Sequence, residues 1–431
     1  MLDRTGISLR ERETAEAQPA PRRTRSSMLA PFQIRSFRFQ WSADLLTSWA
    51  FEMETIILGW YVLTETQSVL WLTMFGAVLY LGTLVAPLFG VAGDRLGHRN
   101  VLLGMRVAYA VFAGTLLILA LSGLVTPTVV LIVSSFVGMV RPSDLGVRSA
   151  LVADNMPPDR LIPAMSIART TSDSARVAGA LAGASIFEMF GLAPAYVMVT
   201  CFYVLGALLM LGVPQPVRQV SLAMTPSDPN PSPWLDLKAG VAKVRDTPML
   251  MALVALAFLA NLTAFPLTNG LLPYVAKNIY AIDQTGLGLL AAAFASGALA
   301  GSVVLSHAGG NVFLPRLMIV GTLIWYALLL AFAQMPGPVG GAVCLLLAGF
   351  MQTFCMVPLS IILLRAAGEK FRGRIMGVRM MAIYSLPLGL LAAGPLIGWI
   401  GWRATASLYA TIGLVFTMII ASRWRANLWR V

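Results

Sequence analysis

Three carboxylates fall inside the first long apolar run of this sequence. Asp44, Glu52 and Glu54 lie within residues 41–64, and an ionisable group in a membrane-spanning helix costs at least about 2.5–3.5 kcal/mol. Residues two apart on a helix point about 200° apart, so the two glutamates cannot both face one cavity. We predict that one binds a proton or cation and that the other packs. Asp44 is either a further proton site or an interfacial residue.

Two further charged sets lie in the fourth and fifth apolar runs. Each lies on one face of its helix, because its members are three or four residues apart. The sets are Arg141, Asp144 and Arg148, and Arg169, Asp173 and Arg176. Since consecutive spans run antiparallel, we expect a ladder in which each aspartate pairs with an arginine of the other helix. It is either a structural salt-bridge cluster or a gate and proton relay, with Asp173 as a proton candidate.

The elements that carry these charges are long enough to cross a membrane. Of 431 residues, 58% are hydrophobic and 12% are charged, whereas a soluble domain is about 25% charged. A spanning helix needs roughly 20 apolar residues. The runs fall at residues 41–64, 68–93, 100–124, 126–151, 162–190 and 192–213, and again at 248–273, 285–309, 313–335, 337–364, 375–400 and 403–422. The predicted fold class is an all-α membrane protein with twelve transmembrane helices in two pseudo-symmetric six-helix bundles.

A short internal sequence repeat supports the division of the chain into two related halves. Asp159-Arg160-Leu161 lies ten residues before Arg169, and Glu369-Lys370-Phe371 lies ten residues before Arg379. Such repeats are typical of transporters whose substrate path runs between two related halves.

The polar segments predict the domain organisation. We expect a disordered cytoplasmic tail over 1–36, a bundle over 37–213, a cytoplasmic linker with an amphipathic helix over 214–247, a bundle over 248–422 and a basic cytoplasmic tail over 423–431. Lys and Arg gather in every second connection, which places both termini in the cytoplasm. The expected location is the bacterial inner membrane.

Composition argues against several other classes of protein. The net charge of +12 is accounted for by membrane orientation, so the lipid bilayer is an expected partner and nucleic acid is not. The three cysteines and two histidines lack metal-ligand spacing. No nucleophile–base pair or phosphate loop is present either. We therefore expect no enzyme, no catalytic residue, no metal and no cofactor, and we expect a monomer.

A glycine-rich charged loop joins the second and third runs. It reads Gly90-Val91-Ala92-Gly93-Asp94-Arg95-Leu96-Gly97-His98-Arg99, and Gly97 permits a tight turn. The loop resembles the one between the second and third spans of the major facilitator superfamily. The resemblance implies a latch in which Asp94 holds the outward-open state against the 373–377 region. Its residues are Gly90, Asp94, Arg95, Gly97 and Arg99.

Other segments resemble the enterobactin-exporter-like and drug-efflux branch of that superfamily. They are Arg141-Pro142-Ser143, Asp159-Arg160-Leu161-Ile162-Pro163 and Phe371-Arg372-Gly373-Arg374-Ile375-Met376-Gly377. The resemblance implies a secondary transporter that uses a proton gradient to export amphipathic organic molecules, drug-like or siderophore-like.

The second half offers polar and aromatic residues rather than charges, and such a wall suits an amphipathic small-molecule organic substrate. Together with two arginines that could attract an anion, the cavity candidates are Arg106, Arg379, Asn261, Asn269, Gln352, Trp325, Tyr326 and Tyr384. Two alternatives remain open from the sequence. One is an uptake symporter of an organic solute, and the other is an uncoupled lipid translocator or receptor with a transporter fold.

Overall fold

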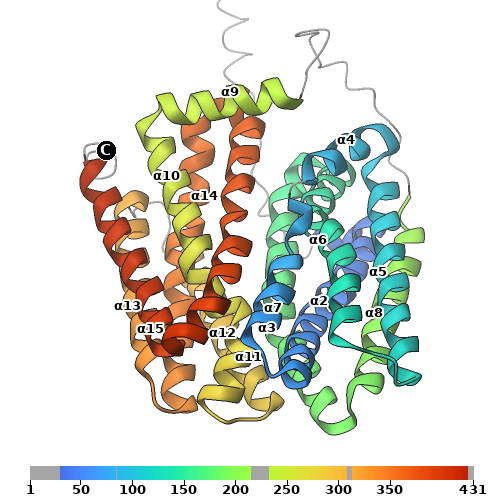
Figure 1. Ribbon diagram of the computed structural model, residues 1–431. Helices are drawn as coiled ribbons and strands as arrows, with labels where there is room; N and C mark the ends of the chain where they lie inside the picture. Colours follow the sequence, from blue (N-terminus) through green and yellow to red (C-terminus); the bar gives the residue numbers. More distant parts are fainter. Residues whose placement is uncertain (1–29, 84, 215–232, 308–312, 426–431) are drawn as a thin grey trace, which may run out of the picture.

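The chain folds into two helical bundles that stand side by side (Figure 1). The computed structural model describes residues 30–83, 85–214, 233–307 and 313–425, and these ranges contain no strand. Apolar runs become helices because, in lipid, a helix satisfies every backbone N–H and C=O within its own segment.

The first bundle contains the helices that precede the linker segment predicted over 214–247. They are α2 (Arg35–Thr66), α3 (Val69–Val78), α4 (Ala86–Leu96), α5 (His98–Leu121), α6 (Pro127–Asn155), α7 (Pro158–Phe190) and α8 (Leu192–Leu211), with 3-10 turns η1 (Ala30–Gln33) and η2 (Leu81–Thr83). Glycine allows α6 to touch the second crossing, since a Cβ on Gly138 would collide with the carbonyl of Val78. That contact helps to place α6 within the bundle.

The second bundle begins with helix α9, which lies across the ends of α10 and α14 (Figure 1). Its elements are α9 (Pro233–Asp246), α10 (Pro248–Leu259), η3 (Ala260–Ala264), η4 (Pro266–Gly270), α11 (Leu272–Tyr274), η5 (Val275–Ile279), α12 (Gln284–His307), α13 (Leu314–Gln334), α14 (Pro338–Ile383) and α15 (Ser385–Arg423). Helix α9 coincides with the amphipathic stretch seen in the sequence. Its side of the molecule is called the α9 end below.

The five-segment division of the chain stays a prediction. Residues 1–29 of the expected tail, most of the linker (215–232) and residues 426–431 lie outside the described residues. Residues 30–33 form η1, and α2 already begins at Arg35.

The twelve expected crossings are accounted for. Eight helices of the described residues are long and apolar enough to cross a membrane. The charged helices α2 and α7 and the divided α3–α4 crossing add three. Helix α15 supplies two, because Gly401 at φ +80° divides it. The fold is therefore the predicted twelve-helix, two-bundle membrane fold.

The seventh crossing begins as α10 and continues through three π-helical turns, η3, η4 and η5. Pro266 has no backbone N–H to donate to the carbonyl of Leu262. The N–H of Leu271 bonds to the carbonyl of Pro266, five residues back, rather than to that of Leu267, four residues back. Gly389 of α15 lies directly against the Leu262 carbonyl, where a Cβ would not fit. The proline thus loosens one helix, and a glycine of its neighbour fits against it.

Close contacts join the two bundles away from the α9 end. A Cβ on Gly288 of α12 would lie 2.6 Å from the Cβ of Ala184 of α7, and one on Gly76 of α3 would lie 3.1 Å from Leu390 of α15. The first-bundle residues within the hydrophobic core of the second bundle are Ile56, Ala77, Ala180 and Ala184. We call this set of contacts the seal.

Candidate functional site

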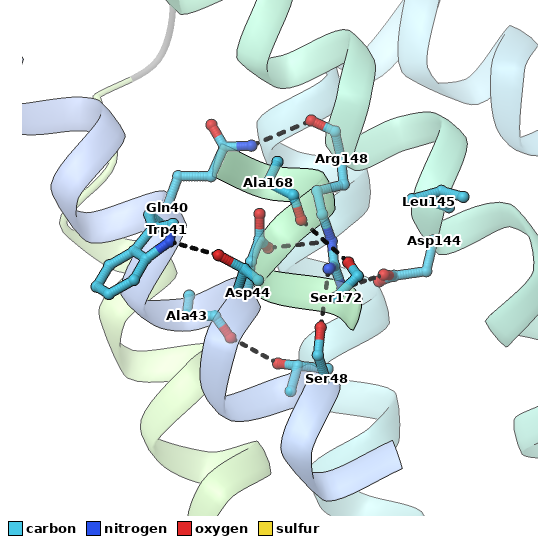
Figure 2. A network of polar contacts seen from close by, with 12 residues as sticks. Gln40, Trp41, Ala43, Asp44, Ser48, Asp144, Leu145, Arg148, Ala168 and Ser172 are labelled. Atoms are coloured by element: carbon cyan, nitrogen blue, oxygen red, sulfur yellow. Dashed lines mark hydrogen bonds and ion pairs between the residues drawn. The ribbon is translucent and has the colours of Figure 1, made fainter. Parts of the chain in front are cut away.

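Four charged side chains form a closed ring inside the first bundle. Asp44 of α2 and Asp144 of α6 alternate with Arg106 of α5 and Arg148 of α6, and none is more than 5% exposed. The N–O distances are 2.7 Å and 3.0 Å from Arg106 to Asp44 and Asp144, and 3.3 Å and 2.6 Å from Arg148 to the same two. Arg148 also donates to Ser48 at 3.0 Å (Figure 2). The ring has no net charge, which is what makes its burial tolerable.

The ladder expected between the fourth and fifth crossings is wrong. Asp144 pairs with Arg148 on its own helix and with Arg106, and Asp173 pairs with Arg169 on its own helix at 3.1 Å. The reason is packing. Helix α7 lies mainly against α2 and α12, whereas α6 lies mainly against α5. Antiparallel order predicts the depth of a residue but not the direction in which its helix faces.

Two ring members were expected elsewhere. Arg106, expected in the substrate cavity, is 0% exposed, and Asp44, expected as a proton or interfacial site, accepts a hydrogen bond from it. A usable signal existed in the sequence. Asp44 lies nine residues after the start of α2 and Arg106 eight residues after the start of α5. Both helices start at the α9 end, so these two residues lie at a similar distance from that end of the bundle.

Glu54 points into the first bundle. Its carboxylate accepts hydrogen bonds from the hydroxyls of Tyr203 at 2.8 Å and Tyr196 at 3.2 Å, both on α8, and the residue is 6% exposed. Of the two glutamates in the first crossing, Glu54 is therefore the one that packs inside the bundle.

Glu52 points the other way, toward α7. Its side chain is 26% exposed, and its nearest cation is Arg176, 39% exposed, with 3.9 Å between Nε and Oε1. Arg141 of α6 lies within electrostatic range of Glu52 and Glu54, donates to Thr55 at 2.9 Å and lies over the ring of Phe51 at 4.7 Å. We call Glu52, Arg141 and Arg176 the central face.

The central face borders the seal. Ile56 and Ala180 lie one helical turn beyond Glu52 and Arg176, four residues on in each case, and both are buried in the core of the second bundle. The exposed parts of Glu52 and Arg176 therefore lie between the bundles, on the α9 side of the seal.

The glycine-rich loop forms the turn expected of it. Gly97 has φ +86° between α4 and α5. Arg99 donates to the carbonyls of Val213 at 3.0 Å and Leu211 at 3.2 Å, so it caps the end of α8, a role the sequence did not suggest. His98 Nδ1 lies 2.7 Å from Asp154 at the end of α6.

Other parts of the proposed latch cannot be placed. The side chains of Gly90, Asp94 and the 373–377 region lie outside the described residues, as does that of Arg379. Arg95 is exposed.

The cavity candidates of the second bundle divide into two groups. Trp325 and Tyr326 are 0% exposed, and Tyr326 shares a 2.8 Å hydrogen bond with Thr263. They are core residues rather than lining residues in this conformation. Asn269 is exposed, Asn261 and Tyr384 are half-buried and Gln352 is 9% exposed. Asn261 donates to the carbonyl of Ala257 at 2.8 Å, within its own helix.

Comparison with known sequences identifies a family. The profile of the Major Facilitator Superfamily matches residues 41–385. No curated protein sequence matches the chain.

Solved structures of transporters share this fold. A POT family transporter in complex with a thioalcohol-conjugated peptide has a TM-score of 0.71 at 13% identity, with 92% of this chain and 97% of that chain covered. A D-xylose–proton symporter has a TM-score of 0.66 at 14% identity, with 89% and 97% covered. The human organic anion transporter MFSD10 (TETRAN) has a TM-score of 0.64 at 16% identity, with 90% and 99% covered.

Proposed function

This chain belongs to the major facilitator superfamily, and we propose that it is a proton-coupled exporter of amphipathic organic molecules that works by alternating access. The family and fold make it a membrane-spanning secondary transporter rather than an enzyme. We propose that the α9 end and both termini face the cytoplasm of a bacterial cell. The loop from Gly90 to Arg99 is proposed as its gating latch.

One observation carries the proposal. Glu52 is the carboxylate of the first crossing that is partly exposed, lies beside the seal and is only loosely paired, at 3.9 Å. A proton that neutralises this group changes the charge where the two bundles meet, and so shifts the balance between inward-open and outward-open states. Glu54 lacks this exposure, and its tyrosine partners already satisfy it.

Two further facts support the finer points. Among the similar structures is a D-xylose–proton symporter, which supports proton coupling in a transporter of this fold. The resemblance of the Arg141, Asp159 and Phe371 segments to efflux proteins supports export.

The test uses everted membrane vesicles, in which the α9 end faces the medium. Cationic, neutral and anionic amphipathic dyes are each supplied in the medium, and the lumen is acidified. We expect at least one of these dyes to accumulate in the lumen and a protonophore to abolish that accumulation. Glu52→Gln should abolish coupled movement, whereas the matched change Glu54→Gln should spare it. Proton coupling is wrong if no dye responds to the gradient, and the role of Glu52 is wrong if neither substitution matters.

Uptake by proton symport is the second candidate. It is favoured by the two arginines beside Glu52, because an anionic cargo held there binds more tightly once Glu52 is neutral, and so moves with the proton. In the same everted vesicles a symporter drives preloaded dye out of the acidic lumen. The direction of dye movement therefore separates the two candidates.

A further inference from the structure

We propose that the central face binds the anionic group of the cargo, so that the transported molecule is an organic anion, such as an amphipathic carboxylate. This inference rests on the proposed function, because it names the chemical class carried at the same site.

The central face has more positive than negative charge. Arg141 has no carboxylate within ion-pair distance among the described residues, and its contacts are the hydroxyl of Thr55 and the ring of Phe51. Among the described residues, the one carboxylate within 4 Å of Arg176 is that of Glu52, at 3.9 Å. The two guanidinium groups thus lie near Glu52 without a close ion pair. The second carboxylate in electrostatic range of Arg141, Glu54, accepts hydrogen bonds from Tyr196 and Tyr203.

The buried ring shows what full pairing looks like in the same bundle. There, each arginine meets two carboxylates at 2.6–3.3 Å, and none is more than 5% exposed. Guanidinium groups prefer paired, short N–H···O contacts with carboxylates. The short ion pairs of the ring come closer to that preference than the 3.9 Å pair of the central face, although Nε of Arg106 and Nε of Arg148 make no hydrogen bond. The central face therefore has donors left for an anion.

Arg176 lies where cargo can reach it, whereas Arg141 is half-buried. Arg176 is 39% exposed, and the seal begins one turn further on with Ala180. A charge excess between two low-dielectric walls acts more strongly on an anion than the same excess on an open surface.

Glu52 acts as the internal competitor for the cargo. Its carboxylate occupies the neighbourhood of Arg176 while it is charged, and Tyr80 is a further titratable group within electrostatic range of all three residues of the central face. Neutral Glu52 leaves both arginines to the cargo anion. Proton binding and anion binding therefore favour one another, which is the coupling of the symport candidate and not of proton-driven export.

The test measures binding to the purified full chain in detergent by titration calorimetry. The probes are 1-naphthaleneacetate and 1-pyrenebutyrate, each compared with its uncharged amide. We expect at least one carboxylate to bind about tenfold or more tightly than its amide. Arg141→Gln and Arg176→Gln should each remove most of that preference, and Glu52→Gln should strengthen carboxylate binding. Arg403→Gln, the same change at an exposed arginine of α15, should change nothing.

Three results overturn the inference: amides that bind as tightly as carboxylates, no binding of either carboxylate, or unchanged binding by folded arginine variants. Thermal unfolding of each variant verifies folding. The proposed function is tested by a separate result. Carboxylate binding without any gradient-driven dye movement overturns proton coupling but not the anion site, whereas gradient-driven movement of neutral dyes alone overturns the anion site.

Discussion

Arg106 of α5 donates a hydrogen bond to Asp44 of α2 across 2.7 Å. That bond joins two residues that are 62 positions apart in the sequence. It closes the buried ring with Asp144 and Arg148. The ring lies in the same bundle as the central face, but its charges are all paired. Its role is therefore to hold α2, α5 and α6 together.

The first prediction concerns this ring. Arg106→Gln leaves Asp44 with less compensation in the interior, and we expect a loss of about 3–5 kcal/mol of stability. Adding Asp44→Asn removes that uncompensated charge and leaves Asp144 with Arg148. The double variant should therefore be more stable than the sum of the single losses. Detergent-solubilised variants are compared by thermal unfolding, and strictly additive losses would contradict the ring.

The second prediction concerns the tyrosines around Glu54. Tyr203→Phe removes the 2.8 Å donor from a buried carboxylate, which costs about 1–3 kcal/mol. Tyr61→Phe is the control, because its hydroxyl bonds only to the carbonyl of Val125 near the surface. We expect a lower unfolding temperature for Tyr203→Phe than for the control, with gradient-driven transport retained. Loss of transport in a well-folded Tyr203→Phe protein would give Glu54 a role in coupling.

The third prediction concerns Arg99. Its guanidinium caps the last carbonyls of α8, where a cation also complements the helix dipole. Arg99→Ala should destabilise the first bundle by about 1–2 kcal/mol, and Arg99→Lys should recover part of the loss. Arg95→Ala, an exposed arginine of the same loop, is the comparison. Equal unfolding temperatures for Arg99→Ala and Arg95→Ala would show that the cap contributes nothing.

The fourth prediction concerns the seal. A leucine at Gly288 collides with Ala184 and Ala180, so Gly288→Leu should favour states in which the seal is open. Thr73→Cys, at a site that is 0% exposed and touches Gly394, should then react faster with a membrane-impermeant maleimide. Exposed Cys201 is replaced first. Gly104→Leu, at a site where an added Cβ meets nothing within 4 Å, should leave the rate unchanged, and equal rates in both variants would refute a moving seal.

The fold was predictable from sequence because it depends on properties that a sequence displays directly. Apolar runs of sufficient length form helices in lipid wherever they occur. The turn at Gly97 followed from a residue that tolerates positive φ. Helices α2 and α7 were found despite their charges, because the runs around Glu52 and Asp173 remained apolar.

The site was less predictable because it depends on how helices rotate about their axes. Opposite orientations of Glu52 and Glu54 followed from helical geometry alone. Which of them faces the second bundle did not, since Tyr196 and Tyr203 lie more than 140 residues away. Arg106 was misplaced for the same reason: its depth was readable, but its partner Asp144 depended on packing between α5 and α6.

The π-helical turns of the seventh crossing have a mechanical consequence. In such a turn the N–H bonds five residues back, and moving that bond to the fourth residue restores an α turn. When the wider turn moves along the helix, only the residues between its old and new positions rotate, by about 100°. Asn261 and Asn269 lie on opposite sides of Pro266. A one-step slip there would swivel one amide past the other while both ends of the helix stayed anchored.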